Sequence, residues 1–313
     1  MRELRNRVVA EVAKVVVGQD HVVDVLLAAT TVGGHVLLEG VPGVAKTLLA
    51  NAFARALGVD FRRVQFTPDM LPTDLTGTMT LRTTAAGSDL AFRAGPIFTN
   101  LVLADEINRT PPKTQSALLE AMQEHQVSVD GIAHRLPSPF LVVATQNPIE
   151  YEGTYPLPEA QLDRFLAKVD VGYPSATDEV SMLRLAHRGV APATLDAVQP
   201  VVRADELKDA GARVDAVTAS DDVLAYIAAI VRRTREVPSV ALGASPRAAV
   251  HLLAAAKAAA TMVDRDYVIP DDVQAVSRAV LRHRLLIRPE AELERYRADD
   301  AIASTLAAVP VPR

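Results

Sequence analysis

The stretch GVPGVAKT, residues 40–47, decides how the rest of the chain is interpreted. It follows the phosphate-binding pattern G-x-x-x-x-G-K-[ST] at Gly40, Lys46 and Thr47, but Ala45 stands where the pattern has its second glycine. In such a loop, inward-turned backbone N–H groups and the start of a helix hold a phosphate anion. The question is therefore whether the loop can adopt this conformation with alanine in place of glycine at residue 45.

The residues around the loop supply the strand and the helix that such a site requires. VLLE precedes the loop, and TLLANAFARALG follows it with apolar residues at helical spacing. We expect Ala45 to enter the helix with ordinary backbone angles and Gly43 to take the special conformation, so that the missing glycine costs little. Lys46 would then reach the β- and γ-phosphates of a nucleotide, and Thr47 would bind Mg²⁺. The alternative is an ordinary strand-to-helix turn that contains Lys-Thr by coincidence.

Apolar runs that end abruptly in polar residues or glycine indicate buried parallel strands. The runs are HVLLEG (35–40), LVLADE (101–106) and FLVVATQN (140–147), and they alternate with helical patterns as in βαβ units. Because ligands of open parallel sheets bind beyond the carboxyl ends of the strands, we expect the polar ends to share one crevice. The sequence therefore predicts an α/β fold with a mostly parallel sheet.

Polar side chains at two of these strand ends are candidates for catalysis. Asp105 and Glu106 are adjacent carboxylates after a buried strand, which is costly unless a positive group is bound. A nucleotide-bound Mg²⁺ would satisfy Asp105, and Glu106 could then orient or deprotonate the attacking water. The amide of Asn147 could position the same water. The alternatives are a polar strand end in solvent and, for Asn147, the opening of an Asn-Pro turn.

After about residue 172 the sequence becomes helical. Ser175, Ser220 and Ser245 are placed to cap helix starts. A boundary near Pro174 divides the chain into a nucleotide-binding core, residues 1–173, and a small helical domain, residues 174–313. The predicted helices of this second part span residues 175–189, 220–236, 245–263 and 270–284.

The composition excludes several classes of protein. With no cysteine among 313 residues, disulfides, thiolate metal sites and a cysteine nucleophile are excluded, and the seven histidines form no zinc motif. The formal net charge of −5 argues against nucleic acid as the main partner. There is no apolar run of about 18 residues and no signal-peptide pattern in MRELRNRVVAEVAK, so we expect no membrane span and a cytoplasmic location.

Two segments of the first half predict β-hairpins. TMTLRTTAAGSDLAFRAG (78–95) alternates apolar residues on both sides of a small-residue turn. HQVSVDGIAHRLPSPF (125–140) has Asp130-Gly131 between alternating apolar residues, a stronger signal. Decoration of a sheet edge is the alternative to a functional role for both hairpins.

In order along the chain, GVPGVAKT, LADEINRTPPKTQSALLEAMQE, ATQNP, LPEAQLDRF and GASPRA resemble the MoxR family of AAA+ ATPases. The resemblance runs from about VVGQD (16–20) to the end of the helical part, and alanine in the P-loop is characteristic of that family. It implies an AAA+ P-loop NTPase fold: an αβα core with a parallel sheet, followed by a small all-α lid domain. It also implies Mg²⁺-dependent hydrolysis of ATP to ADP and phosphate.

The resemblance assigns roles to the matching residues. Thr47 and Asp105 would hold Mg²⁺, Glu106 would be the catalytic carboxylate, and Asn147 would be the sensor-1 amide. The nucleotide would contact Gly40, Val41, Pro42, Gly43, Val44, Ala45, Lys46, Thr47 and Leu48 of the loop and, through its adenine, Val17, Gly18 and Gln19.

Two arginines resemble residues that reach the γ-phosphate. Arg164, in EAQLDRF, resembles the arginine finger that AAA+ subunits project into a neighbour's site, where it stabilises transition-state charge. Arg247 resembles the sensor-2 arginine of the lid; a cation in the first turn of a helix opposes the macrodipole and is better explained by a nearby phosphate. The alternatives are a surface salt bridge of Arg164 with Asp163 or Glu159 and a solvated Arg247. Arg109, in EINRT, is a second candidate for action in trans.

By resemblance, the hairpins correspond to the helix-2 insert and the pre-sensor-1 hairpin of the clade that contains MoxR, the magnesium-chelatase motor subunit and MCM-type helicases. There they face the pore or the substrate. The favoured function is ATP-driven, chaperone-like remodelling, assembly or metal-cofactor insertion of a protein client by a homo-oligomer, expected to be a hexameric ring.

A partner with a von Willebrand factor A (VWA) domain would be a separate chain, because no D-x-S-x-S site is present. A DNA-dependent motor and a nucleotide-gated scaffold are the alternative functions. Against the motor, the second hairpin has no lysine cluster, and aromatic residues make up only 4% of the chain.

Overall fold

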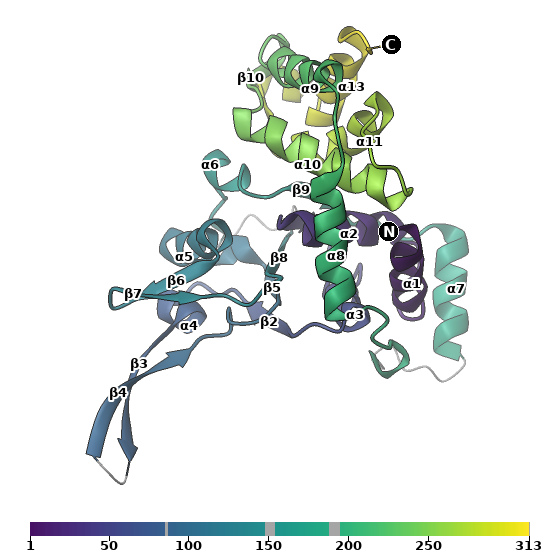
Figure 1. Ribbon diagram of the computed structural model, residues 1–313. Coiled ribbons are helices and arrows are strands. Elements are labelled where there is room, and N and C mark those ends of the chain that lie inside the picture. Colours follow the sequence, from purple (N-terminus) through teal and green to yellow (C-terminus); the bar gives the residue numbers. More distant parts are fainter. Residues whose placement is uncertain (85–86, 148–153, 188–194, 313) are drawn as a thin grey trace.

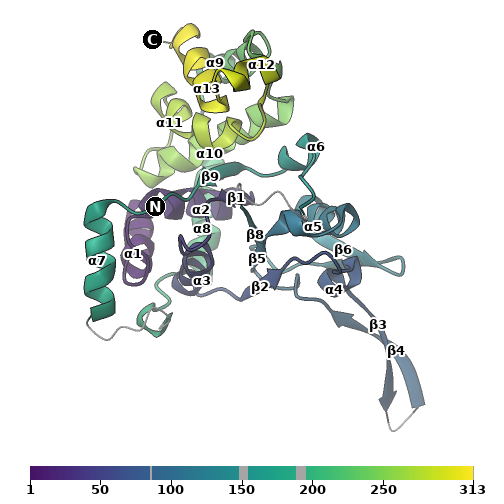
Figure 2. The same ribbon diagram turned by 180° about the vertical axis from the view of Figure 1, so that it is seen from behind.

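The computed structural model describes residues 1–84, 87–147, 154–187 and 195–312. Figures 1 and 2 show a central sheet covered by helices, with a helical C-terminal part at one end and a long β-hairpin that projects from the other. Within these residues no helix is long and apolar enough to cross a membrane. The arrangement confirms the predicted α/β fold with an αβα core and a helical lid.

Five parallel strands form the central sheet, and β1, which leads into the loop GVPGVAKT, is internal. The three strands predicted from apolar runs are confirmed. The edge strands carry no such run, because they are only partly buried; in β2 only Val64 is buried. In spatial order the strands are β2 (Phe61–Gln65), β5 (Leu101–Asp105), β8 (Leu141–Gln146), β1 (Val36–Glu39) and β9 (Ala167–Asp170).

Side chains that alternate along the strands fill two apolar cores, one on each face of the sheet. Val36 and Leu38 of β1 contribute to one core, and Leu37 contributes to the other. The first core is covered by α1 (Arg2–Val12), α2 (Asp20–Val32), α3 (Lys46–Leu57) and α8 (Ala204–Ala216). The second is covered by α4 (Pro72–Thr76) and α5 (Pro112–Glu124).

The chain after the sheet returns to the first core before it enters the lid. Helix α7 (Ala176–His187) begins with Ser175 as its cap and lies beside α1 in both views (Figures 1 and 2). After the short helix η2 (Leu195–Ala197), α8 packs into the first core, and the separate lid core begins only at Val217. The division of the chain between residues 173 and 174 stays a prediction.

A third apolar core holds the C-terminal helices together. Two predicted helix starts are confirmed, because the Ser220 and Ser245 hydroxyls accept hydrogen bonds from the N–H groups of Val223 and Ala248. The β10–β11 pair and α13 go beyond the helices expected from the sequence. The lid consists of α9 (Asp221–Thr234), β10 (Val240–Leu242), α10 (Pro246–Met262), α11 (Pro270–Leu281), β11 (Leu286–Ile287), α12 (Pro289–Leu293) and α13 (Ala298–Ala308).

Both predicted hairpins are confirmed. The pair β3 (Gly77–Thr84) and β4 (Gly87–Ala94) projects from the body (Figure 1). Leu81 and Leu90 lie opposite each other in this pair and are 68% and 66% exposed. The pair β6 (Gln126–Val129) and β7 (Ile132–Arg135) turns at Asp130-Gly131, where both residues have positive φ, as a type I′ turn requires. A stacked Phe92–His134 pair, with ring centroids 3.8 Å apart, connects the two hairpins.

A buried histidine joins three elements at the start of β1. His35 Nδ1 accepts a hydrogen bond from the N–H of Val142 at 3.0 Å, and Nε2 lies 3.0 Å from the carbonyl oxygen of Met122, to which it can donate. Burial lowers the pKa of His35 from 6.5 to about 4, so the ring is neutral and Nδ1 remains an acceptor. The imidazole thus serves as a neutral connector inside the core.

We predict that His35→Asn makes the stability of the protein less dependent on pH. Because the folded-state pKa lies below 6.5, the unfolded chain binds more protons between about pH 4 and 6.5, and stability falls as the pH decreases through that window. The asparagine carbonyl can still accept from Val142. Urea unfolding at several pH values should show a slope lower by up to about 1.4 kcal/mol per pH unit, the equivalent of one proton. An unchanged slope would contradict the assignment.

Candidate functional site

The loop GVPGVAKT connects β1 to α3, which begins at Lys46. Gly43 has φ +87°, so the expected special conformation at this glycine is confirmed. The expectation of ordinary backbone angles at Ala45 is wrong: with φ 60° and ψ 23° it is left-handed. The chain completes its turn at the residue before the helix, where the pattern has glycine. Alanine therefore accepts a cost of roughly 1–2 kcal/mol at this position.

Two contacts fix the loop: Gly40 packs closely against the chain after β9, and Lys46 bonds to carbonyl oxygens of the loop itself. A side chain at Gly40 would collide with the carbonyl oxygen of Val171, so the loop lies tightly against the end of β9. Lys46 Nζ donates to the carbonyl oxygens of Gly40 and, at 3.3 Å, Val41. The ammonium group therefore lies across its own loop, in a position from which it can exchange carbonyl oxygens for those of a phosphate.

Asp105 is held by three side chains at the end of β5 and is only 7% exposed. Thr145 donates to its Oδ1 at 2.5 Å, and Thr47 lies 3.5 Å from its Oδ2. The guanidinium of Arg63 on β2 binds Oδ2 through Nε at 2.9 Å and Nη2 at 2.7 Å. From the sequence, only Mg²⁺ is expected as the positive group beside Asp105, whereas in the structure Arg63 neutralises this carboxylate within the chain.

Glu106 occupies a left-handed backbone conformation, with φ 57°, that its neighbours stabilise. Its N–H donates to Thr145 Oγ1 at 2.9 Å. Its Oε2 accepts from Gln65 Nε2 at 2.6 Å and pairs with Arg109 Nε at 3.1 Å. Arg109 therefore binds Glu106 of its own chain, and its action in trans stays a prediction.

The polar strand ends meet as expected, but two members of the cluster, Arg63 and Gln65, come from β2. The register of the sheet places Gln65 directly beside Asp105. The sequence offers only the short polar run FRRVQ as a signal, which does not reveal its strand partner. The side chains on β2 are found only once the pairing is known.

Of the remaining nucleotide-site candidates, Asn147 lies at a strand end, and Gly18 and Gln19 precede α2. Asn147 directly follows β8 and is buried, whereas the proline of the alternative Asn-Pro turn lies outside the described residues. Gly18 has φ +76° and lies against Asp178 of α7. Gln19 is buried at the start of α2, and its Oε1 has no hydrogen-bond partner within the described parts of the chain. Val17 precedes this turn, and its contact with adenine stays a prediction.

The oxygen ligands at Thr47 and Asp105 fit a nucleotide-bound Mg²⁺ better than a metal cage made by protein alone. In residues 1–84, 87–147, 154–187 and 195–312 there is no group of three or more His, Asp or Glu side chains that could hold a metal ion. Mg²⁺ commonly takes one or two protein ligands and completes its octahedron with phosphate and water oxygens. One hydroxyl and one carboxylate are sufficient for that arrangement.

Arg164 lies at the edge of the sheet where the strands start, and the loop with Lys46 lies at the edge where the strands end. The starts of β1 and β9 are marked by a bond from Leu166 N–H to His35 O at 2.8 Å, and their ends by one from Val171 N–H to Glu39 O at 2.7 Å. The loop follows the ends, whereas Arg164 precedes the start of β9. Its Nη1 donates to the carbonyl oxygen of Leu119 at 2.9 Å. Within the described residues it forms no ion pair with Asp163 or Glu159.

Arg247, in the first turn of α10, lies at the same edge as Arg164. Its Nη1 is 3.5 Å from Asp163 Oδ2, so the structure gives this cation a carboxylate partner from the core. A pocket of about 200 Å³ is lined by both arginines together with His125 and His251. The structure thus collects Lys46, Thr47, Asp105 and Glu106 at one edge of the sheet and the two arginines at the other.

We predict that Ala45→Gly keeps nucleotide binding and leaves the free energy of unfolding unchanged or raises it by up to about 1 kcal/mol. Glycine adopts the left-handed conformation without the steric cost, which offsets its larger entropy in the unfolded chain. The matched control is Ala50→Gly in the interior of α3, which should destabilise by about 1 kcal/mol. Denaturant unfolding measures both, and a clear loss of stability for Ala45→Gly would contradict the strain argument.

Comparisons with known proteins agree with this arrangement. The model of the ATPase family associated with various cellular activities (AAA) matches residues 35–167, and an AAA lid domain model matches residues 232–305. A crystal structure of a candidate ATPase from Cytophaga hutchinsonii ATCC 33406 superposes with a TM-score of 0.89 at 42% identity, covering 99% of this chain and 96% of that one.

Relatives that match nearly the whole chain include proteins with the family name. The chain is 48% identical to YeaC of Bacillus subtilis, over 100% of this chain and 96% of that protein. It is 46% identical to Chaperone MoxR1 of Mycobacterium tuberculosis, over 98% and 82% of the two chains. It is 34% identical to protein MoxR of Methylorubrum extorquens, over 99% and 96%. The chain therefore belongs to the MoxR family of AAA+ ATPases.

Proposed function

We propose that this protein is a Mg²⁺-dependent ATPase that converts ATP and water to ADP and phosphate in a ring of identical subunits, expected to be a hexamer, and uses the energy to remodel a protein client. The observation that carries the proposal is the separation of the polar groups between two edges of the sheet. One edge holds the phosphate loop and both carboxylates, and the other holds a pair of arginines.

The loop and its lysine would bind the nucleotide. The N–H groups at the start of α3 and the ammonium group of Lys46 favour an anion at this position. Lys46 would replace its bonds to the Gly40 and Val41 carbonyls by bonds to phosphate oxygens. Thr47 and Asp105 would hold Mg²⁺, and the bound ion would neutralise charge on the phosphates. Arg63 would then share Asp105 or release its Oδ2.

Glu106 would act on the attacking water. Its backbone is fixed by Thr145, whereas its carboxylate is held by Gln65 and Arg109. A carboxylate held in this way can orient a water or accept its proton once one of those partners yields. Asn147, buried at the end of the neighbouring strand, would position the same water through its amide.

Arg164 and Arg247 would complete the site of a neighbouring subunit. A single chain keeps them at the edge opposite its own loop, so their role in hydrolysis requires a second copy of the chain. An arginine that reaches a transferring phosphoryl group stabilises the charge that develops there. This requirement is the reason for proposing a homo-oligomer instead of an active monomer.

A protein client is favoured over nucleic acid. The name of the relative Chaperone MoxR1 supports this choice, and so do the exposed leucines of the projecting hairpin, Leu81 and Leu90, which are apolar groups suited to contact with protein. The exposed charges of this hairpin are of both signs, at Arg82, Asp89 and Arg93. Remodelling, assembly and insertion of a metal cofactor remain the classes of work proposed for the client, with a VWA-domain partner as a separate chain. A cytoplasmic location belongs to the same proposal.

Two substitutions separate nucleotide binding from hydrolysis. We predict that Lys46→Ala abolishes binding of ATP, because the loop loses the cation that contacts the phosphates. Glu106→Gln should leave binding intact and lower turnover by about 100-fold or more, because the carboxylate that acts on water is lost. Fluorescent-nucleotide titration and phosphate release measure the two effects. Tight binding of ATP by the Lys46→Ala variant would refute the assignment of the loop.

The client and the partner can be captured with the same hydrolysis-deficient variant. Tagged Glu106→Gln protein is loaded with ATP or, as the control, with ADP, and the retained proteins are identified. We predict that one dominant client or a VWA-domain protein is recovered only in the ATP state. Recovery of nuclease-sensitive DNA complexes would favour a DNA motor instead. No turnover by the purified, assembled wild-type protein would favour a nucleotide-gated scaffold.

A further inference from the structure

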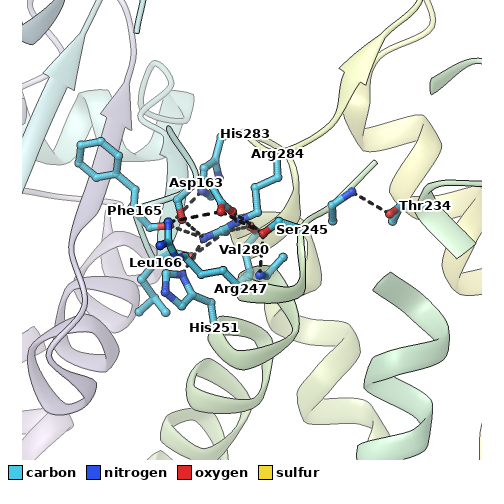
Figure 3. Close-up of polar contacts among 12 residues, drawn as sticks. Asp163, Phe165, Leu166, Thr234, Ser245, Arg247, His251, Val280, His283 and Arg284 are labelled. Atoms are coloured by element: carbon cyan, nitrogen blue, oxygen red, sulfur yellow. Dashed lines mark hydrogen bonds and ion pairs between the residues drawn. The ribbon is translucent and has the colours of Figure 1, made fainter. Parts of the chain in front are cut away.

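The segment of residues 163–166, which carries Arg164, is bound from the lid by one buried arginine, Arg284. Four bonds join its guanidinium to the segment on both sides of Arg164, including one from Nη2 to the carbonyl oxygen of Asp163 at 3.1 Å. Nε donates to Asp163 Oδ1 at 2.8 Å, and Nη2 to the carbonyl oxygen of Phe165 at 2.6 Å. Nη1 donates to the carbonyl oxygen of Leu166 at 3.3 Å. Figure 3 shows this convergence of core and lid residues.

The burial of Arg284 is nearly complete, since its side chain is only 1% exposed. Burying a guanidinium is tolerated only when its charge is paired and its donors are satisfied. Val280 O and His251 Nδ1 accept the bonds that the segment does not take up, and Asp163 supplies the opposite charge. Burial lowers the pKa of Arg284 to about 10, so the group stays charged near neutral pH.

Two lid histidines, His251 and His283, belong to this contact between core and lid, and both are neutral. We call the contact of Arg284 and its neighbours with residues 163–166 the joint. Burial lowers the pKa of His251 to about 4, which keeps Nδ1 available as the acceptor for Arg284. His283 is also buried, which lowers its pKa well below 6.5, and its Nε2 lies 3.1 Å from Phe165 O, to which it can donate. The carbonyl of Phe165 is therefore held by two lid side chains.

The same joint also holds Arg247. Asp163, whose Oδ1 binds Arg284, pairs with Arg247 through Oδ2 and accepts from the Ser245 hydroxyl at 2.9 Å. Arg247 lies one helical turn from His251 on α10, so both arginines of the shared pocket are anchored to one network. A shift of Arg284 would displace the backbone beside Arg164 and the carboxylate beside Arg247 together.

We propose that Arg284 is a positioning residue that fixes Arg164 and Arg247 as one unit for use in the neighbouring subunit's site. The proposal rests on the proposed function, because it requires that Arg164 acts in trans. Arg284 itself faces the joint between core and lid, away from the phosphate loop, and has no part in nucleotide binding by its own chain. Its planar fork, with donors in three directions, is what a lysine lacks.

The first test compares Arg284→Lys with Arg282→Lys. The control residue, Arg282, also pairs the lid with the core, at Asp170, but does not touch the segment that carries Arg164. We predict that Arg284→Lys lowers the kcat of the assembled protein by about 100-fold, the size expected for misplacement by about 1 Å, without changing the Kd for nucleotide. Arg282→Lys should retain most of the activity.

Subunit mixing separates positioning from a general loss of structure. Arg284→Lys subunits keep a competent phosphate loop, and Glu106→Gln subunits keep a competent arginine pair. A mixture in equal amounts should therefore regain up to about a quarter of the wild-type rate, because that share of interfaces combines the two. The reference mixture, Arg164→Ala with Glu106→Gln, tests action in trans alone.

The outcomes distinguish the two proposals. Recovery in both mixtures supports Arg284 as a positioning residue. Recovery with Arg164→Ala but not with Arg284→Lys overturns this inference and leaves action in trans intact. No recovery in the reference mixture overturns action in trans and this inference with it. If Arg284→Lys does not fold, Asp163→Asn, which weakens the same joint from the core side, takes its place with the same expected results.

Discussion

The parallel direction of β1 and β9 is the constraint on which both halves of the proposed site depend. The two strands start together beside His35 and end together beside Glu39. Consequently the loop after β1 and the arginine before β9 must lie at opposite edges of the sheet. A local rearrangement cannot join them, because β1 is internal and its apolar residues are buried on both faces. The topology is thus the structural reason for proposing a site that is shared between subunits.

The edge of the sheet that carries the loop GVPGVAKT contains two residues with strained backbone conformations, and neighbouring residues stabilise both. Ala45 and Glu106 both adopt left-handed backbone conformations that glycine would adopt more easily. Ala45 is fixed by the start of α3, and Glu106 by the bond from its N–H to Thr145. Strained residues of this kind cluster where a side chain must point in one direction. Here the strained residues adjoin Lys46, which binds its own loop, and carry the carboxylate of Glu106, which Gln65 and Arg109 hold. The phosphates and the attacking water are proposed to bind at this place.

Sequence patterns predict the parts of this structure whose signals are local. The apolar runs reveal β1, β5 and β8, serine caps mark α9 and α10, and Asp130-Gly131 marks a hairpin. Features that depend on a distant partner are missed. The bond between Arg63 and Asp105 follows from the pairing of β2 with β5, which no short pattern encodes. The angles at Ala45 were mispredicted because they depend on the residue at which α3 begins, and helix boundaries are poorly determined by propensity alone.

The joint between core and lid uses charge where an apolar contact of similar size would be as stable. The two kinds of contact differ in how strictly they fix the relative orientation of core and lid. Apolar surfaces can slide past each other, whereas a guanidinium with acceptors on three sides has one arrangement that satisfies its donors. Moving the lid relative to Asp163 would leave a buried charge without its partner, which is far more costly than weakening the pair of Arg282 with the half-exposed Asp170. A shift of the lid would therefore either break this buried pair or carry with it the segment that holds Arg164, and the cost of breaking the pair favours the second outcome.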